Sequence, residues 1–308
     1  MKNQTIVFKV SDNIKEKMIE YYKDKVREKT PPYAVFQAQE EDTIVTLYES
    51  GKVMFQGISA DIDANMWKDQ EKFLNNRDID TTPSEEKKKE VDKTNYYYST
   101  IGSDEVGVGD YFLPIVVTAS FMDKEDIKFL ESLGVHDSKK LSDDKILSKA
   151  PLIMKKIPYE SYVLSNKEYN RLTKEGYNNN KIKAILHNDM IFKLVNRGYK
   201  YEKIIVDEFT KPWFYYSHLE DESNVVRGIT FITQAEDKNL AVACSSIISR
   251  YLFLKEKEKL EEELGMEVPK GAGDKVDIFG KELVKLKGKS ILFDIAKVSF
   301  KNTDKILS

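Results

Sequence analysis

The sequence predicts two domains, a small α+β domain followed by a larger α/β domain with a mixed central sheet. The chain has 308 residues, and an average domain has roughly 150. A charged segment divides the chain, because residues 69–95 contain 14 charged side chains among 27. Beyond that segment, apolar strand patterns alternate with helical patterns, which is typical of α/β domains.

Composition excludes several classes of protein. Hydrophobic residues make up 41% of the chain, so it has enough apolar side chains for a core and is not disordered throughout. No run of about 18 apolar residues is present, so we predict no transmembrane helix. The single cysteine, Cys244, excludes a disulfide scaffold and a cysteine-based zinc site. No signal peptide and no sign of obligate oligomerisation is evident, so we expect a cytoplasmic monomer.

Residues 1–68 form the predicted small domain. Asp12 precedes the helical spacing of Ile14 and Met18 and is an expected N-cap. The segment at 69–95 has too few apolar side chains to fold alone, so we predict a linker there. The predicted elements of the small domain are a strand at 5–10, a helix at 13–28, strands at 34–39, 43–49 and 53–57, and a short helix near 62–67.

Residues 96–308 form the predicted larger domain. Two apolar runs, at 96–103 and 113–121, flank a glycine-containing turn and predict two strands. Further strands are predicted at 161–165, 203–206 and 228–233. Helices are predicted at 124–133, 143–156, 179–197 and 239–264.

Two adjacent acids, Asp104 and Glu105, lie where the first strand of this domain enters a turn that contains Gly107 and Gly109. Successive strand side chains point to opposite faces, so the two carboxylates need not converge, although the turn interrupts the alternation. Glycine lets the backbone approach a ligand closely. Acids at such a place suit Mg²⁺ or Mn²⁺, which take oxygen ligands. An exposed polar hairpin explains the local pattern equally well.

A further acid, Asp207, ends the apolar strand at 203–206. Ligands of open α/β sheets lie at the carboxyl ends of strands. The same pattern occurs in P-loop ATPases, but the Gly-Lys-Ser that starts at Gly288 lacks the required glycine five residues earlier, where the sequence has Leu283. The spacing therefore excludes a P-loop.

Glu236 and Asp237 follow the predicted strand at 228–233 and precede the long helix. Taken alone, they are better explained as acids at a helix start, where the dipole favours negative charge. Glu236 also joins Asp104, Glu105 and Asp207 in an all-carboxylate set without accompanying histidines or cysteines. Such sets are typical of two-metal phosphodiester chemistry.

Several stretches together resemble one family. They read GSDEVGVGDYFLP at 102–114, DSKKL at 137–141, IVD at 205–207, Glu236 followed by LAVACSSIISRY at 240–251, and PKGAGDKVD at 269–277. On these stretches, residues 96–308 resemble the type 2 ribonucleases H, most closely ribonuclease HIII. Residues 1–68 more weakly resemble the N-terminal domain of the same family, a truncated TATA-box-binding-protein fold.

The resemblance implies an RNase H-like fold and hydrolysis of the RNA strand of RNA–DNA hybrids, leaving 3′-hydroxyl and 5′-phosphate ends. It implies that Asp104, Glu105 and Asp207 are catalytic, metal-binding acids. It assigns Glu236 as the fourth acid, with its neighbour Asp237 as a substitute. The expected cofactor is Mg²⁺ or Mn²⁺.

The resemblance also implies substrate-binding residues. Gly107, Val108 and Gly109 match a turn that lies against the substrate backbone, although the family has Arg or Ser where this chain has Val108. Lys139 and Lys140 follow in a predicted loop, and we expect them to contact phosphate.

The N-terminal module is expected to bind the backbone of the hybrid electrostatically. Because the net charge is −3, such binding has to come from local basic patches. We expect no protein partner. Strand alternation allows only about half of the following residues to face a substrate: Lys9, Tyr48, Lys52, Phe55 and Gln56.

Two alternatives stay open at this point. A ribonuclease HII-like enzyme would cleave at single ribonucleotides in duplex DNA, and a protein without catalysis would only bind hybrids. His187, on the predicted helix at 179–197, is interpreted as structural, and Ser245, Ser246 and Ser249 as small residues that allow close helix packing.

Overall fold

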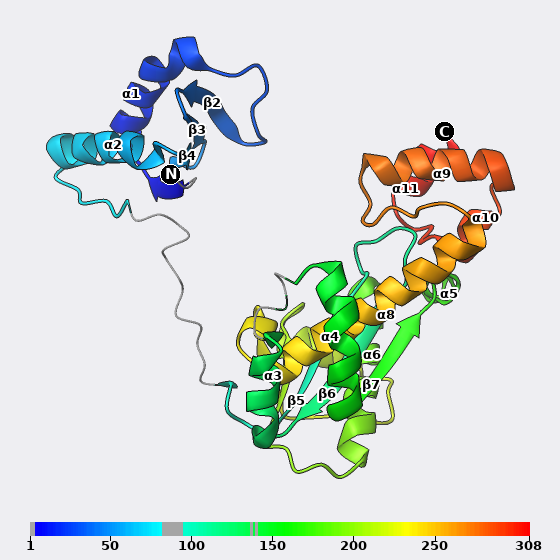
Figure 1. Cartoon of the computed structure of the whole chain (residues 1–308). Coiled ribbons are helices and arrows are strands. Elements are labelled where there is room, and N and C mark those ends of the chain that lie inside the picture. The colour runs from blue at the N-terminus through cyan, green and yellow to red at the C-terminus, as the bar shows by residue number, and fades with distance from the viewer. Residues whose placement is uncertain (1–3, 82–94, 136–137, 139–140) are drawn as a thin grey trace. The chain divides into compact units, whose positions relative to one another are not determined.

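The computed structural model describes residues 4–81, 95–135, 138 and 141–308. The chain divides into two compact units, Met1–Val91 and Asp92–Ser308, which Figure 1 colours from blue to red along the sequence. No helix in the described ranges is both long and apolar enough to cross a lipid bilayer. Each unit has a hydrophobic core of its own.

Within residues 4–81, the first unit forms an antiparallel sheet with strand order β1-β4-β3-β2. Buried residues of both its α-helices share one core with the inner side chains of the strands. Its elements are β1 (Gln4–Lys9), α1 (Asp12–Tyr22), the 3₁₀ helix η1 (Lys23–Lys25), β2 (Ala34–Glu40), β3 (Thr43–Tyr48), β4 (Lys52–Gly57) and α2 (Ala60–Asn75).

The strand register separates the two faces of this sheet. Phe55 is fully buried in the core under the helices. Lys9 pairs with Lys52, and because side chains alternate along a strand, Lys52, Gln56 and their cross-strand neighbours lie on the opposite face. Lys9, Lys52 and Gln56 are therefore on the face that the helices leave open, and Phe55 is not.

Two predicted boundaries in the first unit differ from the structure. The helix predicted to end at residue 28 ends at Tyr22, whose hydroxyl accepts a hydrogen bond from Trp67 at 3.0 Å, and the chain then turns so that Val26 bridges Ala38. The predicted linker starts too early, because α2 continues to Asn75. Its residue Glu71 is buried and bonds the backbone N–H and the hydroxyl of Ser11.

In the described part of residues 95–308, strands form a mixed sheet with the order β7-β6-β5-β8-β9. The pairs β5–β6 and β6–β7 are antiparallel, and β5–β8 and β8–β9 are parallel. The strands are β5 (Thr100–Val106), β6 (Ile115–Met122), β7 (Tyr159–Leu164), β8 (Lys203–Asp207) and β9 (Ile229–Ile232). The helices are η3 (Lys124–Asp126), α3 (Ile127–Ser132), α4 (Asp143–Lys156), α5 (Asn166–Lys174), α6 (Asn179–Asn196), α7 (Pro212–Ser217), η5 (Ala235–Asp237), α8 (Leu240–Leu264), α9 (Asp274–Lys287), α10 (Ile291–Ile295) and α11 (Asn302–Leu307).

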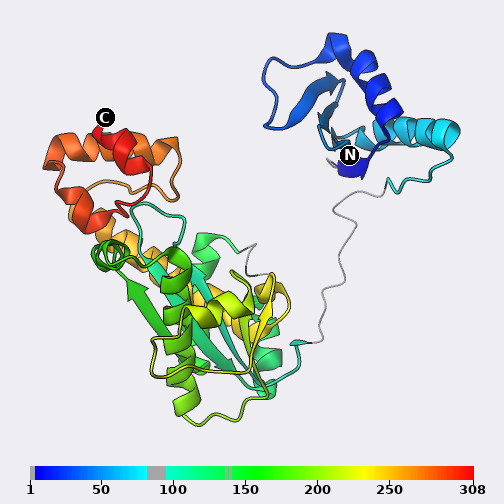
Figure 2. The same ribbon diagram turned by 180° about the vertical axis from the view of Figure 1, so that it is seen from behind.

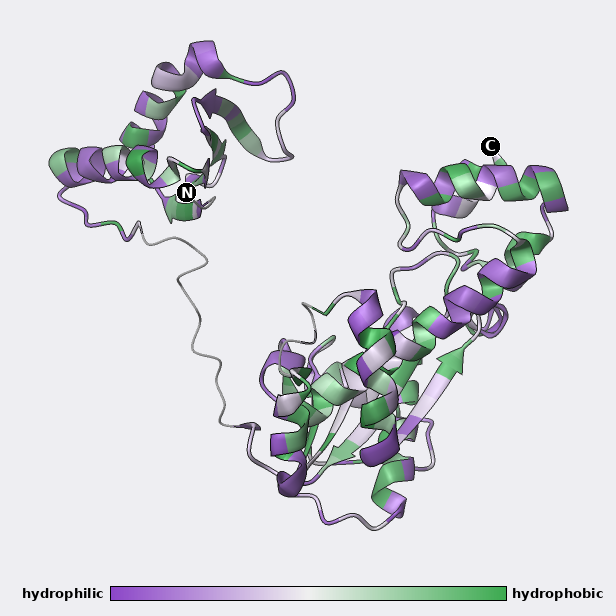
Figure 3. Ribbon diagram, in the orientation of Figure 1, coloured by the Kyte–Doolittle hydropathy of each residue, from purple (hydrophilic) through white to green (hydrophobic). Residues whose placement is uncertain are grey.

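Helices cover both faces of this sheet. Figure 1 shows α8 and α4 across one face, and Figure 2, from behind, shows α6 across the other. Every residue of β6 is buried, as expected for a strand between two helical layers. The half of α8 that leaves the sheet is largely hydrophilic (Figure 3), and α9, α10 and α11 gather near its end.

Close packing of α8 on β5 depends on small residues. A Cβ atom on Gly102 would lie 2.3 Å from the backbone nitrogen of Val242, so no other residue fits there without a shift. The hydroxyl of Ser245 donates to the carbonyl of Gly102 at 2.8 Å, and that of Ser249 to the carbonyl of Asp104 at 3.3 Å. These contacts agree with the predicted packing role of Ser245 and Ser249, whereas the side chain of Ser246 hydrogen-bonds the Asp104 carboxylate.

The first strand of the sheet differs from its predicted span of 96–103. It starts at Thr100 and continues to Val106, because pairing with β6 extends as far as Val116. Tyr96 is buried before the strand begins. Asp104 and Glu105 therefore lie within the strand and not in the turn that follows it.

Candidate active site

Two of the predicted acids meet at the carboxyl ends of neighbouring parallel strands. Ser103 of β5 pairs with Val206 of β8, and Asp104 and Asp207 each follow by one residue. Paired residues of parallel strands point to the same side of a sheet. The carboxylates of Asp104 and Asp207 therefore lie on adjacent strands, on one face of the sheet and near the carboxyl ends of those strands.

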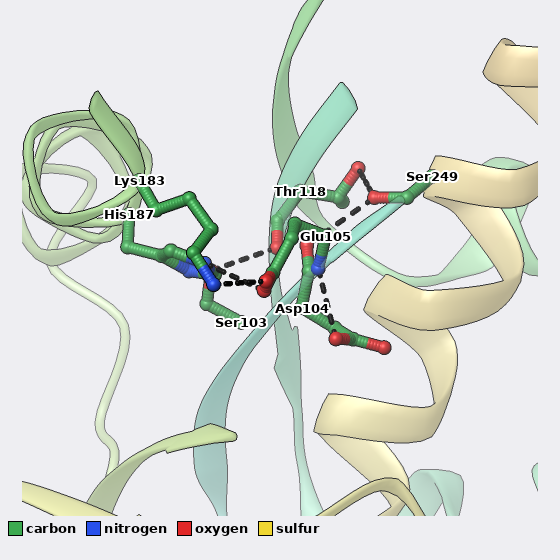
Figure 4. A network of polar contacts seen from close by, with 7 residues as sticks. All are labelled: Ser103, Asp104, Glu105, Thr118, Lys183, His187 and Ser249. Carbon is green, nitrogen blue, oxygen red and sulfur yellow. Dashed lines mark hydrogen bonds and ion pairs between the residues drawn. The ribbon is translucent and has the colours of Figure 1, made fainter. Parts of the chain in front are cut away.

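Adjacent residues of β5 point to opposite faces. In Figure 4, Asp104 points toward α8 and Glu105 toward α6. The hydroxyl of Ser249, from α8, bonds the carbonyl of Asp104, whereas Lys183 and His187, from α6, contact the Glu105 carboxylate. The alternation of the strand thus continues through the acid pair and keeps the two carboxylates apart.

Asp104 lies among other acids. Burial raises the pKa of its carboxyl well above the usual value, and the negative charges of Glu105 and Glu236 raise it further. Hydrogen bonds from the Ser246 side chain and from the backbone N–H of Glu105, the latter at 2.8 Å, oppose this rise. The two hydrogen bonds to the Asp104 carboxylate therefore do not outweigh its burial and the neighbouring negative charges.

Glu105 lies among cationic and polar partners. One carboxylate oxygen is 3.0 Å from Nζ of Lys183, and the other is 3.0 Å from Nε2 of His187. Burial alone would raise the pKa of Glu105, but the hydrogen bonds and charges of these partners outweigh it and lower the pKa to about 2. Nδ1 of His187 lies 2.6 Å from the hydroxyl of Ser103, and the ring of Phe209 stacks on the imidazole.

Asp207 is hydrogen-bonded to the segment that contains Glu236. The backbone N–H of Ala235 donates to its Oδ1 at 2.8 Å, so the end of β8 contacts the start of η5. Glu236 is buried in η5. Neither Glu236 nor Asp237 caps α8, because the side chain of Asn239 accepts from the N–H groups of Ala241 and Val242. The helix-capping interpretation of these acids is therefore wrong.

The donor set on the α8 side suits a divalent cation. No three His, Cys, Asp or Glu side chains within the described ranges already stand in metal-ligating positions. Asp104 and Asp207 nevertheless lie on one face, and after burial, the charges of Glu105 and Glu236 contribute to the raised pKa of Asp104. Clustered carboxylate oxygens are the ligands that Mg²⁺ and Mn²⁺ prefer.

The glycine turn follows β5 directly. Gly107 has a φ of +89°, and a Cβ atom there would lie 2.0 Å from the carbonyl oxygen of Pro114, so the turn requires glycine at this position. Val108 packs against the core on the α6 side, whereas Gly109 has open space around it.

The predicted phosphate contacts Lys139 and Lys140 lie outside the described residues. The residues that flank them are held by α8, since the guanidinium of Arg250 donates to the carbonyls of Ser138 and Leu141 at 2.9 and 3.0 Å.

Sequence reasoning missed Lys183 and interpreted His187 as structural. The two residues are four apart on α6 and so share one face of the helix. That spacing, on a long helix of an α/β domain, is the signal that could have placed both side chains on one side of the sheet.

Comparisons with known proteins agree with this fold. A family model described as ribonuclease HII matches residues 101–303, and one described as a domain of unknown function matches residues 5–77. The chain is 39% identical over 315 residues to the ribonuclease HIII of Bacillus cereus, covering 99% of this chain and 98% of that protein. It is 39% identical to the ribonuclease HIII of Bacillus mycoides, covering 98% of this chain and 97% of that protein.

The solved structures that match this chain include proteins of the same kind. The crystal structure of Bst-RNase HIII in complex with Mn²⁺ matches with a TM-score of 0.69 at 36% identity, covering 98% of both chains. RNase H3 of Aquifex aeolicus shares the fold, with a TM-score of 0.55 at 24% identity, over 96% of this chain and 100% of that one.

Proposed function

This chain belongs to the ribonuclease HIII family, and we propose that it hydrolyses the RNA strand of RNA–DNA hybrids at the acid cluster on the carboxyl ends of β5 and β8. One observation supports this assignment above the others. Asp104 and Asp207 lie near the carboxyl ends of neighbouring parallel strands, on one face of the sheet, and the negative charge of Glu236 acts on Asp104 there. We infer cleavage that leaves 3′-hydroxyl and 5′-phosphate ends.

Asp104 and Asp207 would hold divalent cations, Mg²⁺ or Mn²⁺, and Glu236 and Glu105 would complete the acid set. When bound, two such cations supply the positive charge that activates water and stabilises the leaving oxygen in phosphodiester hydrolysis. The chain itself orients the acids. The N–H of Glu105 fixes the Asp104 carboxylate, and the N–H of Ala235 fixes that of Asp207. Lys183 and His187 hold Glu105 on the other face.

The glycine turn, Gly107–Val108–Gly109, would lie against the substrate backbone next to these acids. Only the 2′-hydroxyl distinguishes RNA from DNA in the cleaved strand, so some group must contact it. Gly109 has open space around it, which lets a sugar approach the backbone. Lys139 and Lys140 would contact phosphate. Val108 cannot form the polar contact that Arg or Ser offers, so the backbone has to bind the substrate at this point.

The open sheet face of the N-terminal unit would bind the hybrid backbone. Lys9 and Lys52 are direct cross-strand partners there, and Gln56 lies on the same strand as Lys52, four residues on. Two adjacent lysines on a face without covering helices suit contact with phosphates, which dominate the affinity for nucleic acids. We propose that the enzyme acts as a monomer in the cytoplasm.

A cleavage assay tests the function. The wild-type chain and its Asp104→Asn variant are incubated with a hybrid whose RNA strand is labelled, in Mg²⁺ and in Mn²⁺. We expect cuts at several places in the RNA strand that depend on the cation and disappear in the variant. Binding of the hybrid without cleavage in either cation would contradict the proposal and indicate a hybrid-binding protein.

Glu236 and its neighbour Asp237 can be compared directly as candidates for the fourth acid of the site. Glu236→Gln should strongly reduce cleavage, whereas Asp237→Asn, one residue further on the same 3₁₀ helix, should reduce it much less. The reverse order would assign Asp237 as the fourth acid.

A second substrate specificity follows from the match of residues 101–303 to the ribonuclease HII model. A DNA duplex that contains one ribonucleotide tests it. Cleavage of this duplex at a rate equal to that of the hybrid would indicate ribonuclease HII-like specificity, and we expect the hybrid to be cleaved faster.

A further inference from the structure

A buried lysine lies beneath the glycine turn. Lys297 follows α10 in the C-terminal part of the chain and has no exposed surface. Its Nζ donates hydrogen bonds to the carbonyl of Gly107 at 3.1 Å, to that of Asp110 at 2.6 Å, and to that of Leu113. One ammonium thus bonds three carbonyls within seven residues of chain.

These contacts do not form an ion pair. The acceptors of the Lys297 ammonium in the described part of the chain are all backbone carbonyls, although the charge of Asp110 also acts on it. Burial lowers the pKa of Lys297 to about 7, so the position carries a cost that a hydrophobic residue would avoid. Three carbonyl acceptors match the three N–H donors of an ammonium, and only the charged form has three.

The same turn is held at a second place by the C-terminal part of the chain. The backbone N–H of Gly271 donates to Oδ1 of Asp110 at 2.5 Å, and the N–H of Tyr111 donates to the carbonyl of Gly271 at 2.9 Å. The backbone N–H of Lys297 donates to the carbonyl of Tyr111 at 2.8 Å. Residues 271 and 297, which are distant in sequence from β5, therefore fix the backbone that follows the acid pair.

We propose that Lys297 is a positioning residue for catalysis: its buried ammonium binds the carbonyl of Gly107 in the glycine turn and those of Asp110 and Leu113 just after it, and so fixes the backbone that faces the substrate. The inference rests on the proposed function, in which Gly107–Gly109 contact the hybrid. It predicts a loss in substrate binding and not in metal binding, because the contacts of Lys297 are to the turn and not to the carboxylates.

The full-length Lys297→Met variant tests the proposal, because methionine keeps an unbranched side chain but has neither charge nor donors. Three quantities are measured: hydrogen exchange of the amides in residues 107–113, KM and kcat for the hybrid, and Mn²⁺ affinity by calorimetry. The control is Asn188→Ala, which removes another buried polar side chain whose hydrogen bonds go to Asn224 and Val226.

We expect faster exchange in residues 107–113 and an increase in KM of about tenfold, the size expected for a lost hydrogen bond to a charged group. We also expect kcat within about threefold of wild type, and unchanged Mn²⁺ affinity. The control should leave exchange in the turn as in wild type.

Three results would overturn the proposal: unchanged exchange in the turn, equal acceleration in the control, or a loss of kcat and Mn²⁺ affinity with KM unchanged. If the wild type does not cleave hybrids, the proposed function fails, whereas the exchange measurement still decides whether Lys297 holds the turn.

Discussion

The two faces of β5 give adjacent carboxylates opposite environments. Asp104, on the α8 side, has acidic neighbours that raise its pKa. Glu105, on the α6 side, has Lys183 and His187 as partners, and its pKa falls to about 2. Both side chains are largely buried, so the difference comes from their partners. Negative charges act on Asp104, whereas α6 supplies a cationic partner to Glu105.

The largest difference between the two faces should appear in activity. Asp104→Asn keeps the side-chain oxygen that accepts from the Glu105 N–H but removes the charge that would bind a cation. We expect kcat to fall by about a thousandfold, which corresponds to about 4 kcal/mol. Steady-state cleavage of the hybrid in Mn²⁺ measures this loss. A variant that retains a tenth of the wild-type rate would show that Asp104 is not an essential ligand.

The second difference between the two faces should appear in the free energy of unfolding, measured with a metal chelator present. Glu105→Gln leaves the Lys183 ammonium without its carboxylate, and we expect a loss of about 3 kcal/mol in the free energy of unfolding. Urea titration monitored by circular dichroism measures it. The control is Glu202→Gln, which breaks an ion pair with Lys124 that is open to solvent and should therefore cost much less than Glu105→Gln. Equal losses would mean that the pair on the α6 side contributes no more than a surface contact.

A smaller effect should come from the partner on α6. Lys183→Met should destabilise the chelated protein by about 2 kcal/mol. Because both changes disrupt one contact, combining it with Glu105→Gln should cost less than the sum of the two single changes. A double-mutant cycle measures this coupling, and strict additivity would contradict a direct interaction.

The smallest effect should be the pH dependence of stability in chelator. The Glu105 carboxylate stabilises the fold above its usual pKa of 4.5 and loses this contribution as the pH falls toward its folded pKa of about 2. Asp104 acts with the opposite sign: because its folded pKa is raised above 3.8, stability falls as the pH rises above that value. As the pH is raised from 4 to 7, the free energy of unfolding of Asp104→Asn should therefore increase by about 1 kcal/mol relative to that of the wild type. A constant difference across this range would contradict the raised pKa.

Much of this arrangement could be predicted from sequence. Acids and glycines near strand ends are local signals, and the structure places the segments around Asp104 and Asp207 on neighbouring strands. The end of β5 could not be predicted, because it depends on pairing between Val106 and Val116. That boundary decides whether Asp104 and Glu105 share a face.

Long-range contacts account for the residues that were missed. Lys297 lies 190 residues from Gly107 in sequence, and no local pattern indicates that a lysine there becomes buried. α5, α7 and the helices α9–α11 were not predicted. The local pattern favours Glu236 as an acid at a helix start, whereas the side chain of Asn239 caps α8 and Glu236 lies in a separate 3₁₀ helix.

The free energy of unfolding, measured in chelator and in Mn²⁺ for wild type, Asp104→Asn and Glu105→Gln, tests the central claim most directly. In chelator, Glu105→Gln should be less stable than wild type and Asp104→Asn at least as stable. Mn²⁺ should stabilise the wild type, because a ligand that binds only the folded state raises its stability, and should not stabilise Asp104→Asn. Variants that shift stability in the same direction in chelator, or an Asp104→Asn variant that Mn²⁺ stabilises as much as wild type, would contradict the division of roles between the two faces of β5.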